Sequence, residues 1–359
     1  MPKIGIHRKG RHFALWNKHF CLFKKRKRNV TLSSPRHRLY NYHAGIASPR
    51  PESYLDDWNI LKNIDEEHWC EIMNSIASTA ESGWDFSSRW LKPEEFQNTT
   101  DASSDQVFNI LNLNTPRVYP TDLNALIAWN FKFLANNTRS DSRRKEYLES
   151  YAQTVYWMRV YLFSEEDQSF YDYHWNKEMK ENEGKRKEKY AASNFFPFWL
   201  KTYSGDENKF DQALYNKIIE LGLIDDYETP IPATFVESGQ QWDFPNVWAP
   251  SVYAVIQGLK TVDRKMAVKA AEKFVNSAMK GFEEYGVNFE KYDARIVGKS
   301  GSGGEYGLQT GFGWTNGVVL SLLDEFGEEM GVPGGAGSGS SIVSMVSSMF
   351  ILATFCFIK

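Results

Sequence analysis

The sequence predicts an all-α fold, and two patterns support this prediction. Three segments carry apolar side chains at intervals of three or four residues, which would place those side chains along one face of a helix. The stretches between these segments are rich in aromatic residues, glycine and proline, which favour loops. From residue 54 onward we therefore expect amphipathic helices to form the core and loops to carry the function.

The first predicted helix begins at Thr121, which follows Pro120 and can cap it. The apolar faces of the three helices, all expected in the core, comprise Leu123, Ile127, Phe131 and Leu134; Leu148, Tyr151, Val155, Met158 and Leu162; and Val268, Ala271, Val275, Ala278 and Phe282. Residues 169–175 are expected to form a short hairpin, and residues 176–189 a charged, solvated insertion.

The two ends of the chain differ from this helical part. Residues 1–38 contain the basic run KKRKR, and we expect them to form a disordered segment outside the domain, which spans residues 39–330. A Gly/Ser linker, 331–341, leads to an apolar tail, 342–359. Small residues followed by a terminal apolar tail are typical of a signal for glycosylphosphatidylinositol (GPI) attachment, and a tail anchor is the alternative. Either would attach the chain to a membrane at the cell surface.

Charge and cysteine content limit the remaining classes of protein. A formal net charge of -3 gives no reason to expect a nucleic-acid partner. The cysteines, Cys21, Cys70 and Cys356, are odd in number and far apart, so we expect neither a disulfide framework nor a metal-ligand cluster. Sequons that would permit N-glycosylation, and hence a glycoprotein, begin at Asn29, Asn98 and Asn136.

The stretch most suggestive of a binding site is QQWDFPNVWAP, residues 240–250. It combines two tryptophans, two prolines, side-chain amides and a carboxylate within eleven residues. Sugar rings offer C–H faces to aromatic rings and hydroxyls to amides and carboxylates, and proline stiffens the backbone that presents them. The stretch therefore suits a polyol-binding loop, and a buried Trp/Pro corner between helices is the alternative.

Four ordered motifs resemble those of the trehalases, glycoside hydrolase family 37. They are PRPESY at 49–54, ESGWDFSSRW at 81–90, QQWDFPNVWAP at 240–250, and FEKYD at 289–293 together with GGEY at 303–306 and GFGWTNG at 311–317. The resemblance covers roughly residues 39–327, the C-terminal part of a family catalytic domain. It implies an (α/α)6 toroid, here incomplete because the family's N-terminal helices are missing, and α,α-trehalose as the small-molecule substrate.

Hydrolysis of a glycosidic bond needs a carboxylic acid that protonates the leaving oxygen and a second carboxyl group that acts as base or nucleophile. Asp85 lies between Trp84 and Phe86, and apolar rings disfavour an ionised carboxylate. Capping of a helix that begins at Ser87 is the structural alternative for Asp85. By its resemblance to the trehalases, Asp85 matches the general acid.

Two glutamates compete for the role of base. Glu305 follows a flexible glycine-rich loop, whereas Glu290 has Lys291 and Tyr292 beside it, which could keep a carboxylate ionised and oriented. The residues alone leave the choice open. The family resemblance implies that Glu290 is the base and that Glu305 contacts the substrate. The family inverts anomeric configuration, which implies that the carboxyl groups of Asp85 and Glu290 lie ~6.5–9.5 Å apart.

Arg50 and Glu52 alternate with prolines in a segment that cannot be helical, and an Arg fork with a carboxylate suits vicinal hydroxyls. The resemblance implies that both bind sugar; a surface ion pair is the alternative. Gly83 is expected to let a sugar hydroxyl approach the backbone, and Trp242 to supply a stacking face. No metal or cofactor is implied, because acid, base and water suffice.

Two hypotheses of different classes follow. The first is an inverting glycoside hydrolase that cleaves α,α-trehalose to glucose, anchored outside the cell by its C-terminus. The second is a truncated, inactive homologue that binds sugar weakly at most.

Overall fold

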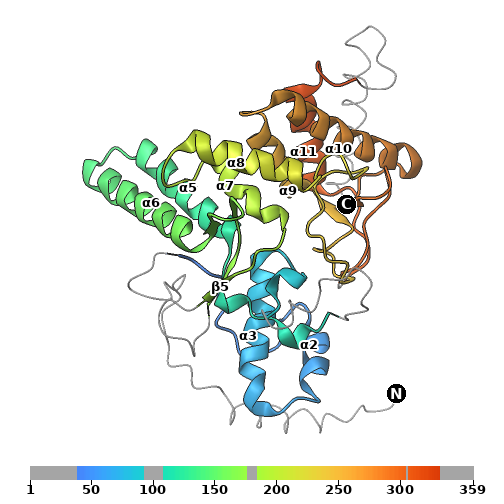
Figure 1. Ribbon diagram of the computed structural model, residues 1–359. Helices are drawn as coiled ribbons and strands as arrows, with labels where there is room; N and C mark the ends of the chain where they lie inside the picture. Colours follow the sequence, from blue (N-terminus) through green and yellow to red (C-terminus); the bar gives the residue numbers. More distant parts are fainter. Residues whose placement is uncertain (1–38, 93–107, 176–183, 305, 332–359) are drawn as a thin grey trace.

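The computed structural model describes residues 39–92, 108–175, 184–304 and 306–331, and this part of the chain is mostly helical (Figure 1). The α-helices are α2 (Tyr54–Leu61), α3 (Glu66–Ser82), α5 (Thr121–Asn137), α6 (Asp141–Tyr161), α7 (Phe196–Leu200), α8 (Glu207–Glu220), α9 (Ala249–Leu259), α10 (Arg264–Tyr285) and α11 (Gly313–Phe326). Short 3-10 helices are η1 (Ser88–Trp90), η2 (Ile110–Asn112), η3 (Thr115–Arg117) and η4 (Ala192–Phe195).

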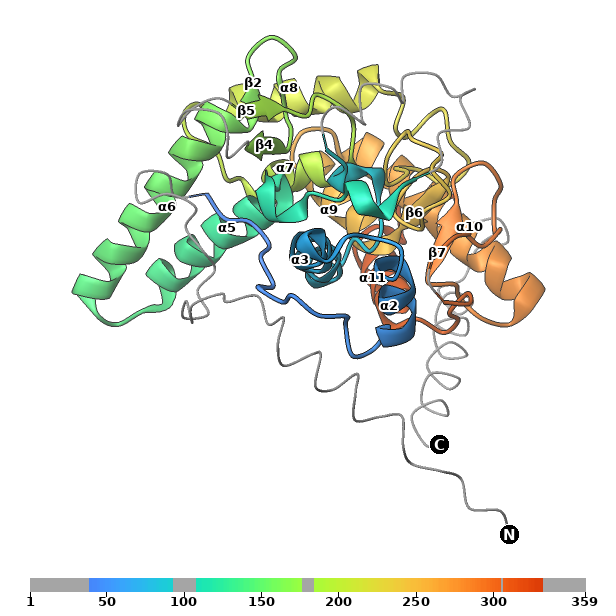
Figure 2. The same ribbon diagram turned by 90° about the horizontal axis from the view of Figure 1, so that it is seen from below.

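Helix α9 lies at the centre of the helical packing. Its sequence APSVYAVIQGL is apolar almost all round, as is usual for a fully buried helix. It packs against α7, α10 and α11, and Figure 1 shows it between the α7–α8 side and the α10–α11 side. In Figure 2, α3 is seen nearly end-on in front of the middle of the molecule, with the α5–α6 hairpin on one side and α10 on the other.

The three predicted amphipathic helices are present as α5, α6 and α10. In α10, the buried face includes Ala271, Val275 and Ala278, as predicted. In α6, Val155 and Met158 are buried, as is Leu162 just beyond its end, but Leu148 is 46% exposed. Burial along α6 is thus confined to its C-terminal half, because the other half extends away from the core (Figure 1).

The predicted apolar face of α5 is not its buried face. The buried positions include Ala125, Ala128 and Ala135, whereas Leu134 is 42% exposed and Phe131 is only partly covered. Alanine leaves room for neighbouring helices to approach closely, and α5 contacts both α6 and α7. The assignment of Leu134 to the core was therefore wrong, because α5 packs against its neighbours through the face that carries alanines.

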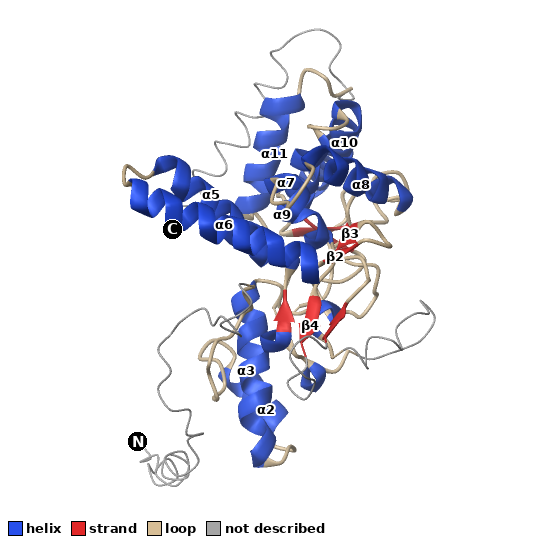
Figure 3. Cartoon of the chain, turned by 60° about the vertical axis from the view of Figure 1, so that its left-hand side comes forward, coloured by secondary structure: helices blue, strands red, loops and turns tan. Residues whose placement is uncertain are grey.

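Three small antiparallel sheets lie between the helices (Figure 3). The strands are β1 (Val118–Tyr119), β2 (Phe163–Ser164), β3 (Ser169–Phe170), β4 (Tyr173–Trp175), β5 (Gly184–Arg186), β6 (Asn246–Trp248) and β7 (Lys291–Asp293). Their order is β1-β4-β5, β2-β3 and β6-β7. The predicted hairpin at 169–175 was wrong, because β3 pairs with β2 while β4 pairs with β1 and β5. Between β3 and β4, the Asp172 carboxylate accepts a hydrogen bond from Arg89 Nε at 2.6 Å, a contact with a distant segment that the local pattern does not reveal.

Two further expectations need correction. The charged insertion is not solvated throughout, because Lys187 donates hydrogen bonds to the carbonyl oxygens of Ser88 (2.9 Å) and Arg89 (2.6 Å). Cys70 in α3 is disulfide-bonded, whereas the number and spacing of the cysteines led us to expect no disulfide framework. Within residues 39–331 as far as they are described, none of the helices has the length and apolar character to cross a bilayer. The proposed disordered start and the apolar tail lie outside the described residues.

Candidate active site

Asp85 lies in a loop that follows α3, here called the acid loop (residues 83–88). Helix α3 ends at Gly83, whose φ of 74° is in the left-handed region that glycine adopts most easily. Trp84 and Phe86 are buried, and Asp85 between them is half-buried. The chain thus turns at Gly83, and Asp85 follows between two buried aromatic residues in the sequence.

The cap of the next helical turn is Ser87 and not Asp85. The Ser87 hydroxyl accepts a hydrogen bond from the Arg89 N–H at 3.0 Å, at the start of η1. Asp243 holds the same turn from another part of the chain, because its carboxylate accepts from the Ser87 hydroxyl (2.7 Å) and from the Ser88 N–H (2.7 Å). Helix capping, which was the structural alternative for Asp85, is therefore the role of Ser87.

Glu290 lies directly before β7 and is 2% exposed. Its Oε1 accepts a hydrogen bond from the Tyr306 hydroxyl at 3.0 Å, and its Oε2 lies 3.5 Å from the Lys291 ammonium. Among the described residues, Oε2 has no hydrogen-bond partner. Trp314 donates from its indole N–H to the Glu290 carbonyl oxygen at 3.2 Å, which fixes the backbone at this point.

Lys291 and Tyr306 interact electrostatically with both Glu290 and Asp85. Burial lowers the pKa of Lys291, against the opposing effect of Glu290 and Asp85. Burial, and then the charge of Glu290, raise the pKa of Tyr306 to about 12, so its hydroxyl keeps its proton at neutral pH. The charges of both carboxyl groups therefore act on the same pair of side chains. Of the two residues predicted to hold the Glu290 carboxylate, Lys291 lies beside it. The hydroxyl of the other, Tyr292, donates to Asn288 instead.

The indole ring of Trp84 in the acid loop belongs to a stack of three indoles. Trp242 is stacked on Trp84 at a centroid distance of 4.7 Å and on Trp248 at 4.0 Å, with interplanar angles of 21° and 4°. Trp314 meets Trp248 edge-on, at 5.5 Å and 88°. Trp242 is 4% exposed. Both faces of its ring are covered by neighbouring indoles, so it does not offer the open stacking face that we expected for a sugar.

The other sequence-predicted residues are placed as follows. Arg50 is buried and forms a two-pronged ion pair with Asp57 of α2, at 2.8 Å and 3.0 Å, and its guanidinium lies 5.4 Å from the centre of the Phe86 ring. Glu52 and Gly83 are exposed. Glu305 lies outside the described residues. The ion pair between Arg50 and Asp57 is thus buried and not on the surface.

A buried charge network is centred on Arg89, which directly follows the acid loop, and it was not predicted from the sequence. The Arg89 guanidinium binds Asp172 through Nε (2.6 Å) and Nη2 (3.1 Å), and Asp122 through Nη1 (2.9 Å) and Nη2 (2.7 Å). It also lies 4.6 Å and 4.5 Å from the rings of Trp84 and Trp90. Only the position of Arg89 in the motif ESGWDFSSRW could have drawn attention to it, because Asp122 and Asp172 lie far away in the sequence.

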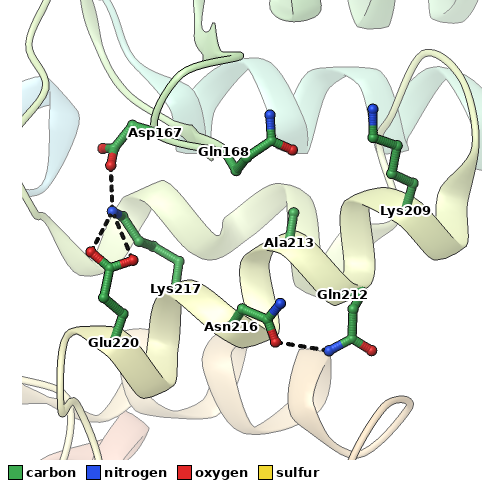
Figure 4. Close-up of a pocket in the computed structure, with 8 residues that line it drawn as sticks. All are labelled: Asp167, Gln168, Lys209, Gln212, Ala213, Asn216, Lys217 and Glu220. Atoms are coloured by element: carbon green, nitrogen blue, oxygen red, sulfur yellow. Dashed lines mark hydrogen bonds and ion pairs between the residues drawn. The ribbon is translucent and has the colours of Figure 1, made fainter.

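A separate groove on the surface has no connection with these residues. It runs along α8 with a volume of about 530 Å³, and Figure 4 shows the Lys217 ammonium between Asp167 and Glu220 at one end. The charge of Lys217 is thus already compensated. Within the described ranges, His, Cys, Asp and Glu side chains form no group of three or more that could hold a metal ion.

The family model and the curated relatives agree on one family. A family model described as Trehalase matches residues 8–327. A trehalase of Bombyx mori is 34% identical over 320 residues, which cover 86% of this chain and 51% of the relative. A trehalase of Homo sapiens is 32% identical over 314 residues, with 86% and 51% covered. The chain thus spans about half the length of these curated relatives. Among solved structures, neutral trehalase Nth1 from Saccharomyces cerevisiae has a TM-score of 0.58 at 16% identity, covers 92% of this chain and 59% of its own, and shares the fold.

Proposed function

This chain belongs to the trehalase family, and on that premise we propose that it hydrolyses α,α-trehalose to two molecules of glucose with inversion of configuration. Asp85 is the general acid and Glu290 the general base. The observation that carries the proposal is the buried Glu290 carboxylate, which has the Tyr306 hydroxyl at 3.0 Å and the Lys291 ammonium at 3.5 Å, two groups on which the charge of Asp85 also acts.

The surroundings of Glu290 suit a base. The carboxylate is buried, one oxygen is held by the Tyr306 hydroxyl, and the other has the Lys291 ammonium at 3.5 Å but no hydrogen-bond partner among the described residues. A carboxylate held in this way keeps a lone pair that can accept a hydrogen bond from a water molecule.

The reaction proceeds in one displacement. Glu290 takes a proton from water, and the water oxygen forms a bond to one anomeric carbon from the face opposite the glycosidic oxygen. The bond between that carbon and the glycosidic oxygen breaks, and Asp85 gives its proton to this oxygen as the second glucose leaves. One product is therefore β-glucose and the other α-glucose. A separation of the two carboxyl groups of ~6.5–9.5 Å would leave room for the water.

The proposed substrate contacts are Arg50, Glu52, Gly83, Trp242 and Glu305. The exposed backbone of Gly83 lies two residues before the acid, and Arg50 lies against the Phe86 ring beside Asp85. Glu305 directly precedes Tyr306, which binds the base. For Trp242, whose ring faces are covered, the proposed contact is limited to the ring edge.

We further propose that residues 39–330 form a partial catalytic domain of the (α/α)6 type. The mostly helical structure and the fold shared with the yeast enzyme support this assignment. A cell-surface location through the tail at 342–359 is proposed from the sequence pattern alone.

Release of glucose from trehalose by the purified chain tests the function. Asp85→Asn and Glu290→Gln are expected to lower the rate by roughly 10²- to 10⁴-fold, the usual contribution of one acid or base. Proton NMR in the first minutes should show equal amounts of α- and β-glucose. Absence of glucose above the level of both variants would refute the proposal, and binding of trehalose in calorimetry without release would favour the inactive sugar-binding homologue.

A further inference from the structure

Three consecutive residues, Gln241, Trp242 and Asp243, bind consecutive parts of the acid loop. The Gln241 side-chain amide donates to the carbonyl oxygen of Asp85. The Trp242 N–H donates to the carbonyl oxygen of Phe86 at 3.1 Å. Asp243 binds the next turn through Ser87 and Ser88. The loop that carries the proposed acid is thus held residue by residue by one tripeptide.

Gln241 also contacts the segment that carries the proposed base. Its Oε1 accepts a hydrogen bond from the Lys291 ammonium at 3.0 Å, and the same ammonium lies 3.5 Å from Oε2 of Glu290. Its own carbonyl oxygen accepts from the Trp248 indole N–H at 2.8 Å. A single side chain therefore connects Asp85 on one side with Lys291 and Glu290 on the other.

The amide has only one orientation that satisfies both partners. A carbonyl oxygen can only accept a hydrogen bond and an ammonium can only donate, so the NH2 group must face Asp85 and the oxygen must face Lys291. Gln241 is 0% exposed. The amide itself is thus shielded from water, and its loss would leave the buried Lys291 ammonium and the part-buried carbonyl oxygen of Asp85 without this partner.

We propose that Gln241 is a positioning residue that sets the placement of Asp85 relative to Glu290. The hydrogen bonds described above for Trp242 and Asp243 go to the acid loop, whereas those of the Gln241 side chain reach both sides. The inference rests on the proposed function for what the two carboxyl groups do, but the connection through Gln241 can be tested without activity.

The test compares Gln241→Met with Gln257→Met in the full chain. Gln257 is an equally suitable buried glutamine on α9, where it donates to Glu325 of α11 at 2.6 Å. Methionine keeps the length of the side chain and removes both hydrogen-bonding groups. Amide hydrogen exchange of residues 84–90 is measured by mass spectrometry, and kcat and KM are measured on trehalose.

Gln241→Met is expected to speed exchange in residues 84–90 about fivefold or more, as loss of a buried hydrogen bond allows. It should lower kcat by roughly 10- to 100-fold with KM within twofold, because misplacement of a catalytic group acts on the chemical step. Gln257→Met should change neither quantity in this way.

Exchange in residues 84–90 that is the same in both variants would overturn the inference, as would a loss of activity that comes entirely from KM. If the wild-type chain releases no glucose, the proposed function fails, and the exchange comparison still decides whether Gln241 holds the acid loop. If Gln241→Met does not fold, Gln241→Glu, which keeps an oxygen for Lys291 but loses the donor to Asp85, is compared with Gln257→Glu by the same exchange measurement.

Discussion

Substitution of Arg89 by methionine is expected to destabilise the fold strongly at neutral pH. The change removes four hydrogen bonds between the guanidinium and the two carboxylates, Asp122 and Asp172, whose side chains are 9% and 4% exposed. Methionine fills similar space, so the main loss is electrostatic. Removing one partner of a buried ion pair typically costs about 3–5 kcal/mol, and two carboxylates would be left without their cation here.

Urea unfolding of the wild type and Arg89→Met at pH 7 measures this loss, and the same pair at lower pH tests its cause. Burial alone would raise the pKa of Asp172, but Arg89 outweighs that effect and holds the pKa below its usual value. In the wild type this contribution is present above pH ~4 and is lost as pH falls through the lowered pKa. Without Arg89, burial dominates and Asp172 takes up a proton more readily. The difference in unfolding free energy should therefore shrink as pH falls from 7 to about 4.

Arg117→Met is the matched control. The Arg117 guanidinium contacts Glu71 at 3.6 Å, and the two side chains are 30% and 62% exposed. We expect a loss below about 1 kcal/mol, as for other surface ion pairs. If Arg89→Met costs no more than this control, or if its deficit does not depend on pH, the explanation through buried carboxylates is wrong.

Two more substitutions probe the candidate site. Tyr306→Phe removes the donor to Oε1 of Glu290 and should lower kcat about tenfold, as loss of a hydrogen bond to a charged group does. Because the pKa of Tyr306 is raised to about 12, the ratio of wild-type to variant initial rates should be the same at pH 6 and pH 9. A ratio that changes across this range would contradict this role of Tyr306. Gly83→Ala and Gly286→Ala should each cost about 1–2 kcal/mol in urea unfolding, because both glycines end a helix at positive φ with open space for the added methyl group. Only Gly83→Ala should also lower glucose release, and equal activity in the two variants would count against a role of Gly83 beside the acid.

The sequence was most informative where local pattern and local structure coincide. The periodic apolar residues of α10 identify both the helix and its buried face, since small and branched side chains there face α9 and α11. The placement of Asp85 between two aromatic residues is also local, and both neighbours are buried. Lys291 contacts Glu290 because the two are adjacent in the chain.

Interactions between distant segments were not predictable in this way. Periodicity in α5 identifies its large apolar residues, but the residues that are buried are alanines, because α6 and α7 pack closely against α5. The same applies to Trp242, whose covered ring faces depend on Trp84 and Trp248. Tyr306 could not be preferred to Tyr292 as the partner of Glu290, because the path of the loop between them is set by tertiary contacts.

The bond between Gln241 and the Asp85 carbonyl joins residues 156 positions apart, and those from Asp243 to Ser87 and Ser88 span 156 and 155. Closing so long a stretch of chain is entropically expensive and slow compared with the formation of individual helices. During renaturation from urea, far-ultraviolet circular dichroism should therefore recover before catalytic turnover does.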